Sequence, residues 1–132
     1  MPDESQHVSQ FKSKSGLKRI TSALGYSIDG LSAAWRHEHA FRQELMVVLP
    51  GVVIALLLPV SRLEKLSLVA VLLLVLIVEL LNSAIEAVVD RVSLERHTLS
   101  KNAKDLGSAA VLLSCLLAAV TWAVVLYPLL GS

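Results

Sequence analysis

The sequence LSLVAVLLLVLIVELLNSAIEAVV occupies residues 66–89 and decides the fold class. Its first part, residues 66–78, is entirely apolar or small, and the apolar character then continues past Glu79, Asn82 and Glu86. A bilayer core about 30 Å thick needs about 20 helical residues. The stretch reaches that length only if these three polar side chains enter or border the membrane. We therefore predict a transmembrane helix that carries polar groups.

Two apolar stretches without any charged residue lie on either side of this one. Residues 45–60 read LMVVLPGVVIALLLPV, and residues 108–130 read SAAVLLSCLLAAVTWAVVLYPLL. Of the 132 residues, 55% are hydrophobic and 17% are charged, whereas a soluble domain has about 25% charged residues. Because the apolar excess is concentrated in three blocks, the composition excludes a soluble globular domain. It predicts an all-α membrane protein with spans near residues 40–60, 63–91 and 103–128.

Lysine and arginine are distributed unevenly around these spans. Six precede the first apolar block, two lie between the first and second blocks, four lie between the second and third blocks, and none follows the third. By the positive-inside rule, the N-terminus and the second loop are cytoplasmic and the C-terminus is on the far side. The net charge of only +1 argues against a nucleic-acid partner. The single cysteine, Cys115, excludes an intrachain disulfide.

The residues before the first span divide into two parts. Residues 1–15 have no hydrophobic periodicity and are expected to form a disordered tail. Residues 16–132 are expected to form a single integral membrane domain. Within it, residues 17–36 have apolar side chains spaced by three or four, which predicts an amphipathic helix on the cytoplasmic membrane surface; the alternative is a helix packed on a soluble partner. These side chains are Leu17, Ile20, Leu24, Ile28, Leu31 and Trp35.

The polar residues of the second span form a row. Glu79, Asn82, Glu86 and Asp90 are separated by three, four and four residues, so they share one face of a helix. A carboxylate inside a span is energetically expensive and normally faces protein or a water-filled cavity. Such oxygen ligands suit magnesium, and a glutamate there can act as a general base. The alternative is a polar stripe that pairs with cations of neighbouring helices and serves assembly only.

Other polar residues lie near the cytoplasmic ends of the spans. Glu38 and Arg42 are four residues apart, so a surface ion pair is the alternative to a functional role. The loop after the second span mixes both signs of charge, which is typical of a solvated loop. Its His97 lacks a His or Cys partner at ligand spacing, which argues against a zinc site. The residues by themselves therefore predict a three-span protein with a carboxylate-lined site on the cytoplasmic side.

Four motifs resemble a known family. They are AAW at residues 33–35, FRQE at 41–44, ELLNSAIEAVVD at 79–90 and AKDLGSAAV at 103–111. In these motifs the chain resembles the prokaryotic diacylglycerol kinase family from about residue 16 to the C-terminus, and the Gram-negative type more than the related undecaprenol kinases. The resemblance implies a homotrimer in the bacterial inner membrane with sites shared between subunits. It also implies phosphorylation of sn-1,2-diacylglycerol by magnesium ATP, giving phosphatidic acid.

The resemblance further implies a role for individual residues. Glu79 is expected to be the general base on the lipid hydroxyl, with Asn82 orienting groups beside it, and Glu38 and Glu86 are expected to hold the magnesium ion. The expected contacts of ATP are Arg19, Tyr26, Glu38, Glu86, Glu95, His97, Lys104 and Asp105. The expected contacts of the lipid are Arg19, Ala23, Glu44, Glu79 and Ser108.

Three other functions remain open on the sequence. The first is an undecaprenol kinase. The second is a small transporter that uses Glu79 or Glu86 as a proton-coupled cation site, although such a protein is expected to have four or more spans or inverted repeats. The third is a non-catalytic assembly subunit, which has no need of Glu38, Lys104 and Asp105 beside the polar row.

Overall fold

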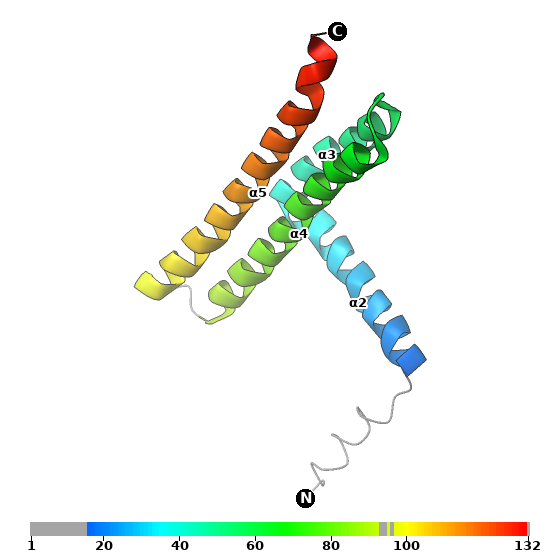
Figure 1. Cartoon of the computed structure of the whole chain (residues 1–132). Coiled ribbons are helices and arrows are strands. Elements are labelled where there is room, and N and C mark those ends of the chain that lie inside the picture. The colour runs from blue at the N-terminus through cyan, green and yellow to red at the C-terminus, as the bar shows by residue number, and fades with distance from the viewer. Residues whose placement is uncertain (1–15, 93–94, 96, 132) are drawn as a thin grey trace, which may run out of the picture. The chain divides into compact units, whose positions relative to one another are not determined.

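The computed structural model describes residues 16–92, 95 and 97–131, so the predicted tail at residues 1–15 lies outside the described residues. The described residues form four helices and no strand: α2 (Gly16–His37), α3 (His39–Leu57), α4 (Arg62–Val92) and α5 (Thr98–Leu130) (Figure 1). The chain divides into two compact units, Met1–Arg36 and His37–Ser132. The second unit contains α3, α4 and α5. The prediction of an all-α protein is confirmed.

Helices α3, α4 and α5 are each long and apolar enough to cross a membrane, which confirms the three predicted spans. The bounds of α4 agree with the prediction to one residue at each end. Helix α3 ends at Leu57, three residues before the predicted end. The reason is Leu58, which has ψ of 144° because it precedes Pro59, and a residue before proline is disfavoured in the helical region.

Helix α5 begins five residues before the predicted span, at Thr98. His97 is the N-cap, and its Nδ1 atom accepts a hydrogen bond from the backbone N–H of Leu99 at 3.1 Å. This bond satisfies one of the N–H groups that have no partner within the first turn of a helix. The helix therefore extends beyond the apolar block and carries Lys101, Lys104 and Asp105 on its first two turns.

The connection between α3 and α4 is fixed by local hydrogen bonds. Ser61 and Glu64 form a capping box: Ser61 Oγ accepts from the Glu64 N–H at 3.1 Å, and Glu64 Oε1 accepts from the Ser61 N–H at 3.3 Å. Lys65 Nζ donates to the carbonyl oxygen of Leu56 at 2.7 Å, which satisfies an end carbonyl of α3. These bonds hold the turn between the two spans.

The three spans pack through side chains that repeat every seven residues. In α4 the buried residues are Leu68, Leu72, Val75, Glu79 and Asn82, in α5 they are Gly107, Ser114, Ala118 and Val125, and in α3 they are Phe41, Val48 and Ala55. A seven-residue repeat aligns neighbouring helices at a small crossing angle, and Figure 1 shows α4 and α5 side by side along their length. The polar Glu79 and Asn82 thus continue the same stripe that forms the apolar interface.

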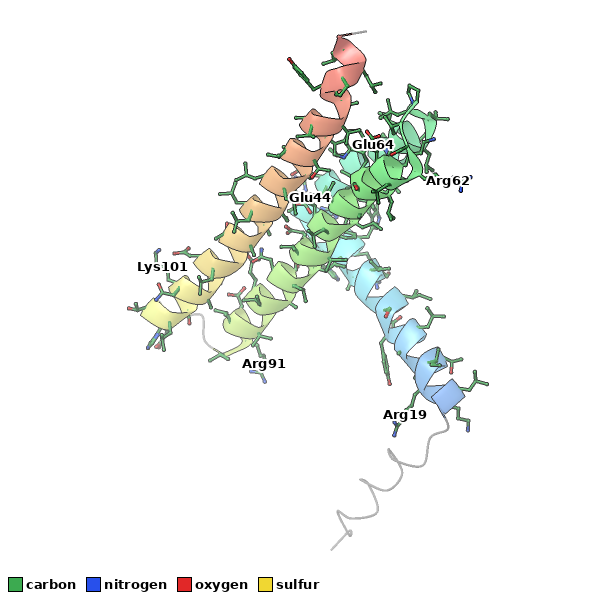
Figure 2. All side chains as sticks on the ribbon, viewed as in Figure 1. Arg19, Glu44, Arg62, Glu64, Arg91 and Lys101 are labelled. Carbon is green, nitrogen blue, oxygen red and sulfur yellow. The ribbon has the colours of Figure 1, made fainter. Side chains whose placement is uncertain are left out.

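The apolar core lies toward the end of the unit where α3 joins α4. Ala55 and Leu68 are completely buried there with Val125, and Trp122 packs against them. Trp122 Nε1 donates to the carbonyl oxygen of Leu68 at 3.3 Å, linking α5 to α4. Figure 2 shows Arg62 and Glu64 at this end and Arg91 and Lys101 at the opposite end, where α4 joins α5.

Replacing Trp122 by Phe is expected to lower the free energy of unfolding by about 0.5–1 kcal/mol, the typical value of a hydrogen bond between helices in a membrane. The substitution removes the Nε1–H donor and keeps an aromatic ring against the core. Thermal unfolding in detergent micelles measures the effect. Tyr127→Phe is the control, because Tyr127 is exposed and loses only its hydroxyl group. Equal losses in both variants would contradict a role for the Trp122 bond.

Helix α2 confirms the helix predicted for residues 17–36. Its row of large apolar side chains is exposed, from 47% for Trp35 to 73% for Leu17. Two hydroxyl groups bond back to their own helix, Thr21 to the carbonyl oxygen of Lys18 and Ser27 to that of Ala23. An exposed apolar row fits a helix that lies at a membrane surface, and that location stays a prediction.

Candidate functional site

The polar row of α4 passes gradually from buried to exposed. Glu79 is 5% exposed and Asn82 is 9% exposed, whereas Glu86 is half-buried and Asp90 is exposed. All four lie on one continuous helix, as the spacing predicts. The row therefore connects the interior of the three-helix unit with the end at which α4 joins α5.

Glu44 of α3 faces Glu79 of α4. The two carboxyl groups interact electrostatically with each other. The Oε2 atom of Glu44 is buried and has no hydrogen-bond partner among the residues that the structure describes. Two carboxyl groups in contact repel each other when both are charged, so such a pair favours a shared proton, a cation or a hydrogen-bond donor from a substrate. The Oε2 atom of Glu44, beside the interior end of the row, can therefore accept a hydrogen bond.

Two more carboxylates act on Glu79 from the outer side of the row. The charges of Glu86 and Glu38 both influence Glu79, so the start of α3 lies in the same region as the polar row of α4. Glu38 immediately precedes α3 in an extended conformation, with φ of −108° and ψ of 104°. Its side chain does not cap α3 within the described structure. The Glu38 carboxylate is therefore not engaged in ending the helix.

One ion pair joins the polar ends of α4 and α5, and a second lies within α5. Lys104 Nζ lies 2.7 Å from Asp90 Oδ1 and links α5 to α4, and Lys101 Nζ lies 2.6 Å from Asp105 Oδ2 within α5. The side chains of both pairs remain between 43% and 76% exposed. Because exposed ion pairs contribute about 0–1 kcal/mol, phosphate groups can replace the carboxylate partner of either lysine at small cost.

The remaining predicted site residues are more dispersed. Arg19, Ala23 and Tyr26 are four and three residues apart on α2, so they share one exposed face of that helix. In the second unit, Glu95 and His97 lie in the connection between α4 and α5, where His97 caps α5. The side chain of Ser108 is exposed, whereas its neighbour Gly107 is buried against α4. The roles expected for these residues stay predictions.

The carboxylates of this region fit a magnesium ion only in part. Among the described residues, no three His, Cys, Asp or Glu side chains gather closely enough to hold a metal ion. Magnesium commonly binds to one or two carboxylates and completes its coordination with water and substrate phosphates. Glu38 and Glu86 are half-buried and come from different segments. The charges of both interact with Glu79. This donor set fits magnesium that arrives with a phosphate ligand.

Sequence reasoning missed two contacts that shape the site. A Cβ atom built on Gly107 would overlap Oδ1 of Asn82, so α5 lies close to α4 beside the polar row. The ion pair of Lys104 with Asp90 joins the row to the residues expected to bind nucleotide. The run of small residues from Gly107 to Ala110 could have indicated the contact of α5 with α4, because small residues allow the backbones of membrane helices to approach closely.

Comparisons with known proteins find similar sequences in one family. The family described as prokaryotic diacylglycerol kinase matches residues 25–126. A diacylglycerol kinase of Pseudomonas aeruginosa is 58% identical over 118 residues, which cover 89% of this chain and 96% of the relative. One of Escherichia coli is 53% identical over 116 residues, covering 88% and 95%. One of Haemophilus influenzae is 38% identical over 112 residues, covering 85% and 95%.

Proposed function

The chain belongs to the prokaryotic diacylglycerol kinase family, and on that basis we propose that it phosphorylates sn-1,2-diacylglycerol with magnesium ATP to give phosphatidic acid. Membership of the family makes the protein a lipid kinase, embedded in the membrane by several spans and using ATP. The finer proposal concerns the lipid, the metal and the residues that serve them.

The observation that carries the proposal is the buried carboxyl group of Glu79, inside a span and facing Glu44. The hydroxyl group of diacylglycerol lies at the membrane interface, and a base that accepts its proton must lie near the same depth. Glu79 is at the buried part of the row, whereas Glu86 and Asp90 follow toward the polar end. We assign Glu79 as the general base and Asn82 as the group that orients the reactants beside it. Glu44 is the nearest candidate to hold the lipid glycerol.

The phosphates are proposed to bind at the more exposed end of the row. Glu38 and Glu86 would hold magnesium, which when bound supplies positive charge against the ATP phosphates. Lys104 and Asp105 would contact the nucleotide, together with Arg19, Tyr26, Glu95 and His97. Phosphoryl transfer needs mainly positioning and neutralisation of charge, and an exposed lysine whose ionic partner is exchangeable supplies both. Arg19, Ala23 and Ser108 complete the proposed lipid path.

The proposed cellular arrangement follows from charge and family. The N-terminus and the α4–α5 connection would be cytoplasmic, because lysine and arginine concentrate there, and the C-terminus would be periplasmic in a bacterial inner membrane. A homotrimer is proposed because of the resemblance of this chain to the prokaryotic diacylglycerol kinase family. Its subunits would share the sites.

A radiolabelled ATP assay in detergent micelles tests the proposal, with diacylglycerol and undecaprenol offered separately. We expect phosphate transfer to diacylglycerol and much slower transfer to undecaprenol, with no ATP consumption beyond background when lipid is omitted. Faster transfer to undecaprenol would contradict the proposed substrate. ATP hydrolysis without any lipid product would contradict the proposed reaction.

A further inference from the structure

Helices α4 and α5 approach each other closely at the polar row. Gly107 is a buried residue of α5, and it faces Asn82 of α4. A Cβ atom built on Gly107 would overlap Asn82 Oδ1 and would lie 3.2 Å from Asn82 Cγ. Both atoms belong to the amide group, which is the functional part of the side chain. Any residue larger than glycine at position 107 must therefore displace the amide of Asn82.

The amide oxygen of Asn82 is enclosed at this contact. Oδ1 is buried and has no hydrogen-bond partner among the described residues. An amide oxygen against a glycine tolerates the Cα–H groups as weak donors, whereas an amide NH₂ group in the same place would lack any acceptor. With the oxygen held against α5, the NH₂ group is left as a donor for the interior of the site, where Glu79 lies three residues away on the same face.

We propose that Gly107 is a positioning residue for Asn82, because its missing side chain leaves a recess that fixes the amide with its NH₂ group toward the reacting groups. The proposal rests on the proposed function, in which Asn82 orients the reactants beside Glu79. Gly107 contacts neither substrate and acts through Asn82 alone. A recess of this kind can fix an asparagine side chain in a membrane helix, where few polar groups are present to hold it by hydrogen bonds.

A second glycine provides a matched comparison. A Cβ atom built on Gly51 of α3 would lie 2.8 Å from Leu72 Cδ1 and 3.9 Å from Trp122 Cζ2. The close atom is the end of a flexible leucine side chain, which can rotate away. Gly51→Ala and Gly107→Ala therefore add the same methyl group inside a helix at a packed interface, but only the second displaces a polar group of the site.

The first experiment compares these two variants in the lipid kinase assay. We expect Gly107→Ala to lower kcat by about 10- to 100-fold, because a displacement of about 1 Å in a positioned group has effects of this size. The KM values for magnesium ATP and diacylglycerol are expected to change little, since Gly107 touches neither. Gly51→Ala is expected to keep turnover close to that of the wild type. Normal turnover for Gly107→Ala, or equal losses in the two variants, would overturn the proposal.

A double-mutant cycle with Asn82→Ala distinguishes positioning from packing. Asn82→Ala by itself is expected to lower turnover and also to vacate the space that a methyl group on residue 107 would occupy. Adding Gly107→Ala to Asn82→Ala is then expected to cause no further loss, because Gly107 acts only through the missing amide. Losses that multiply would show that Gly107 acts by another route and would overturn the proposal.

Folding supplies a second readout. If Gly107→Ala does not assemble by itself, the double variant with Asn82→Ala is expected to recover the folded protein, because the overlap is gone; failure of both would overturn the proposal. Different results would contradict the proposed function: a wild type that transfers no phosphate to diacylglycerol, or normal turnover of Asn82→Ala. Impaired Asn82→Ala together with normal Gly107→Ala would overturn the positioning role and leave the proposed function intact.

Discussion

Replacing Glu79 by Gln is expected to lower phosphorylation of diacylglycerol by about 10²-fold or more, a typical contribution of general-base catalysis. Glutamine keeps the size and hydrogen bonding of the buried side chain but cannot accept the proton of the lipid hydroxyl. The apparent affinity for magnesium ATP is expected to change little, because Glu79 is not among the proposed metal ligands. Initial rates measured against both substrates separate these effects.

Glu64→Gln is the matched control for this prediction. It makes the same chemical change on the same helix, at the end far from the polar row, and glutamine can take the place of glutamate in a capping box. We expect normal turnover and assembly for this variant. Near-normal turnover of Glu79→Gln would remove Glu79 from the mechanism and would favour transfer assisted by the substrate itself.

The Glu38→Gln and Glu86→Gln variants are each expected to raise the magnesium concentration needed for half-maximal activity by about tenfold or more. A divalent cation 4 Å from a carboxylate gains roughly 2 kcal/mol even in water-like surroundings, and this attraction is lost with the charge. Turnover at fixed magnesium is expected to fall, while the protein remains folded. Magnesium titrations of the initial rate, together with thermal unfolding, measure both outcomes.

Asp90→Asn provides the comparison for the metal prediction. Asp90 is an exposed carboxylate on the same row, and it is paired with Lys104. Its replacement is expected to leave the magnesium requirement much closer to that of the wild type, because the neighbouring lysine already neutralises its charge. Wild-type magnesium dependence in both glutamate variants would show that the metal lies elsewhere.

The position of Gly107 illustrates how far sequence reasoning reaches in this protein. The small residues that follow it indicate a close helix contact, yet nothing local in the sequence identifies Asn82 as the partner, 25 residues earlier in the chain. Likewise, the spacing of Glu79, Asn82 and Glu86 predicts a shared helix face, but not which of them is buried. The spacing predicts the shared face because periodicity is a property of one helix. It does not predict burial, because burial depends on the neighbouring helices that cover that face.

The start of α5 also could not be predicted from the sequence alone. The predicted span begins at residue 103. The helix begins at Thr98, because His97 accepts a hydrogen bond from the backbone N–H of Leu99. This N-cap stabilises a polar turn that hydropathy alone assigns to a loop.

The sequence by itself determined the membrane class, the three spans and the shared face of the polar row, because length, hydropathy and a spacing of three or four residues are properties of single helices. Only the tertiary structure decided that Glu44 faces Glu79, that Lys104 pairs with Asp90 and that Gly107 encloses the amide of Asn82. Those contacts join residues on different helices. Their register is set by how the seven-residue stripes of α3, α4 and α5 pack, which no single stretch of sequence contains.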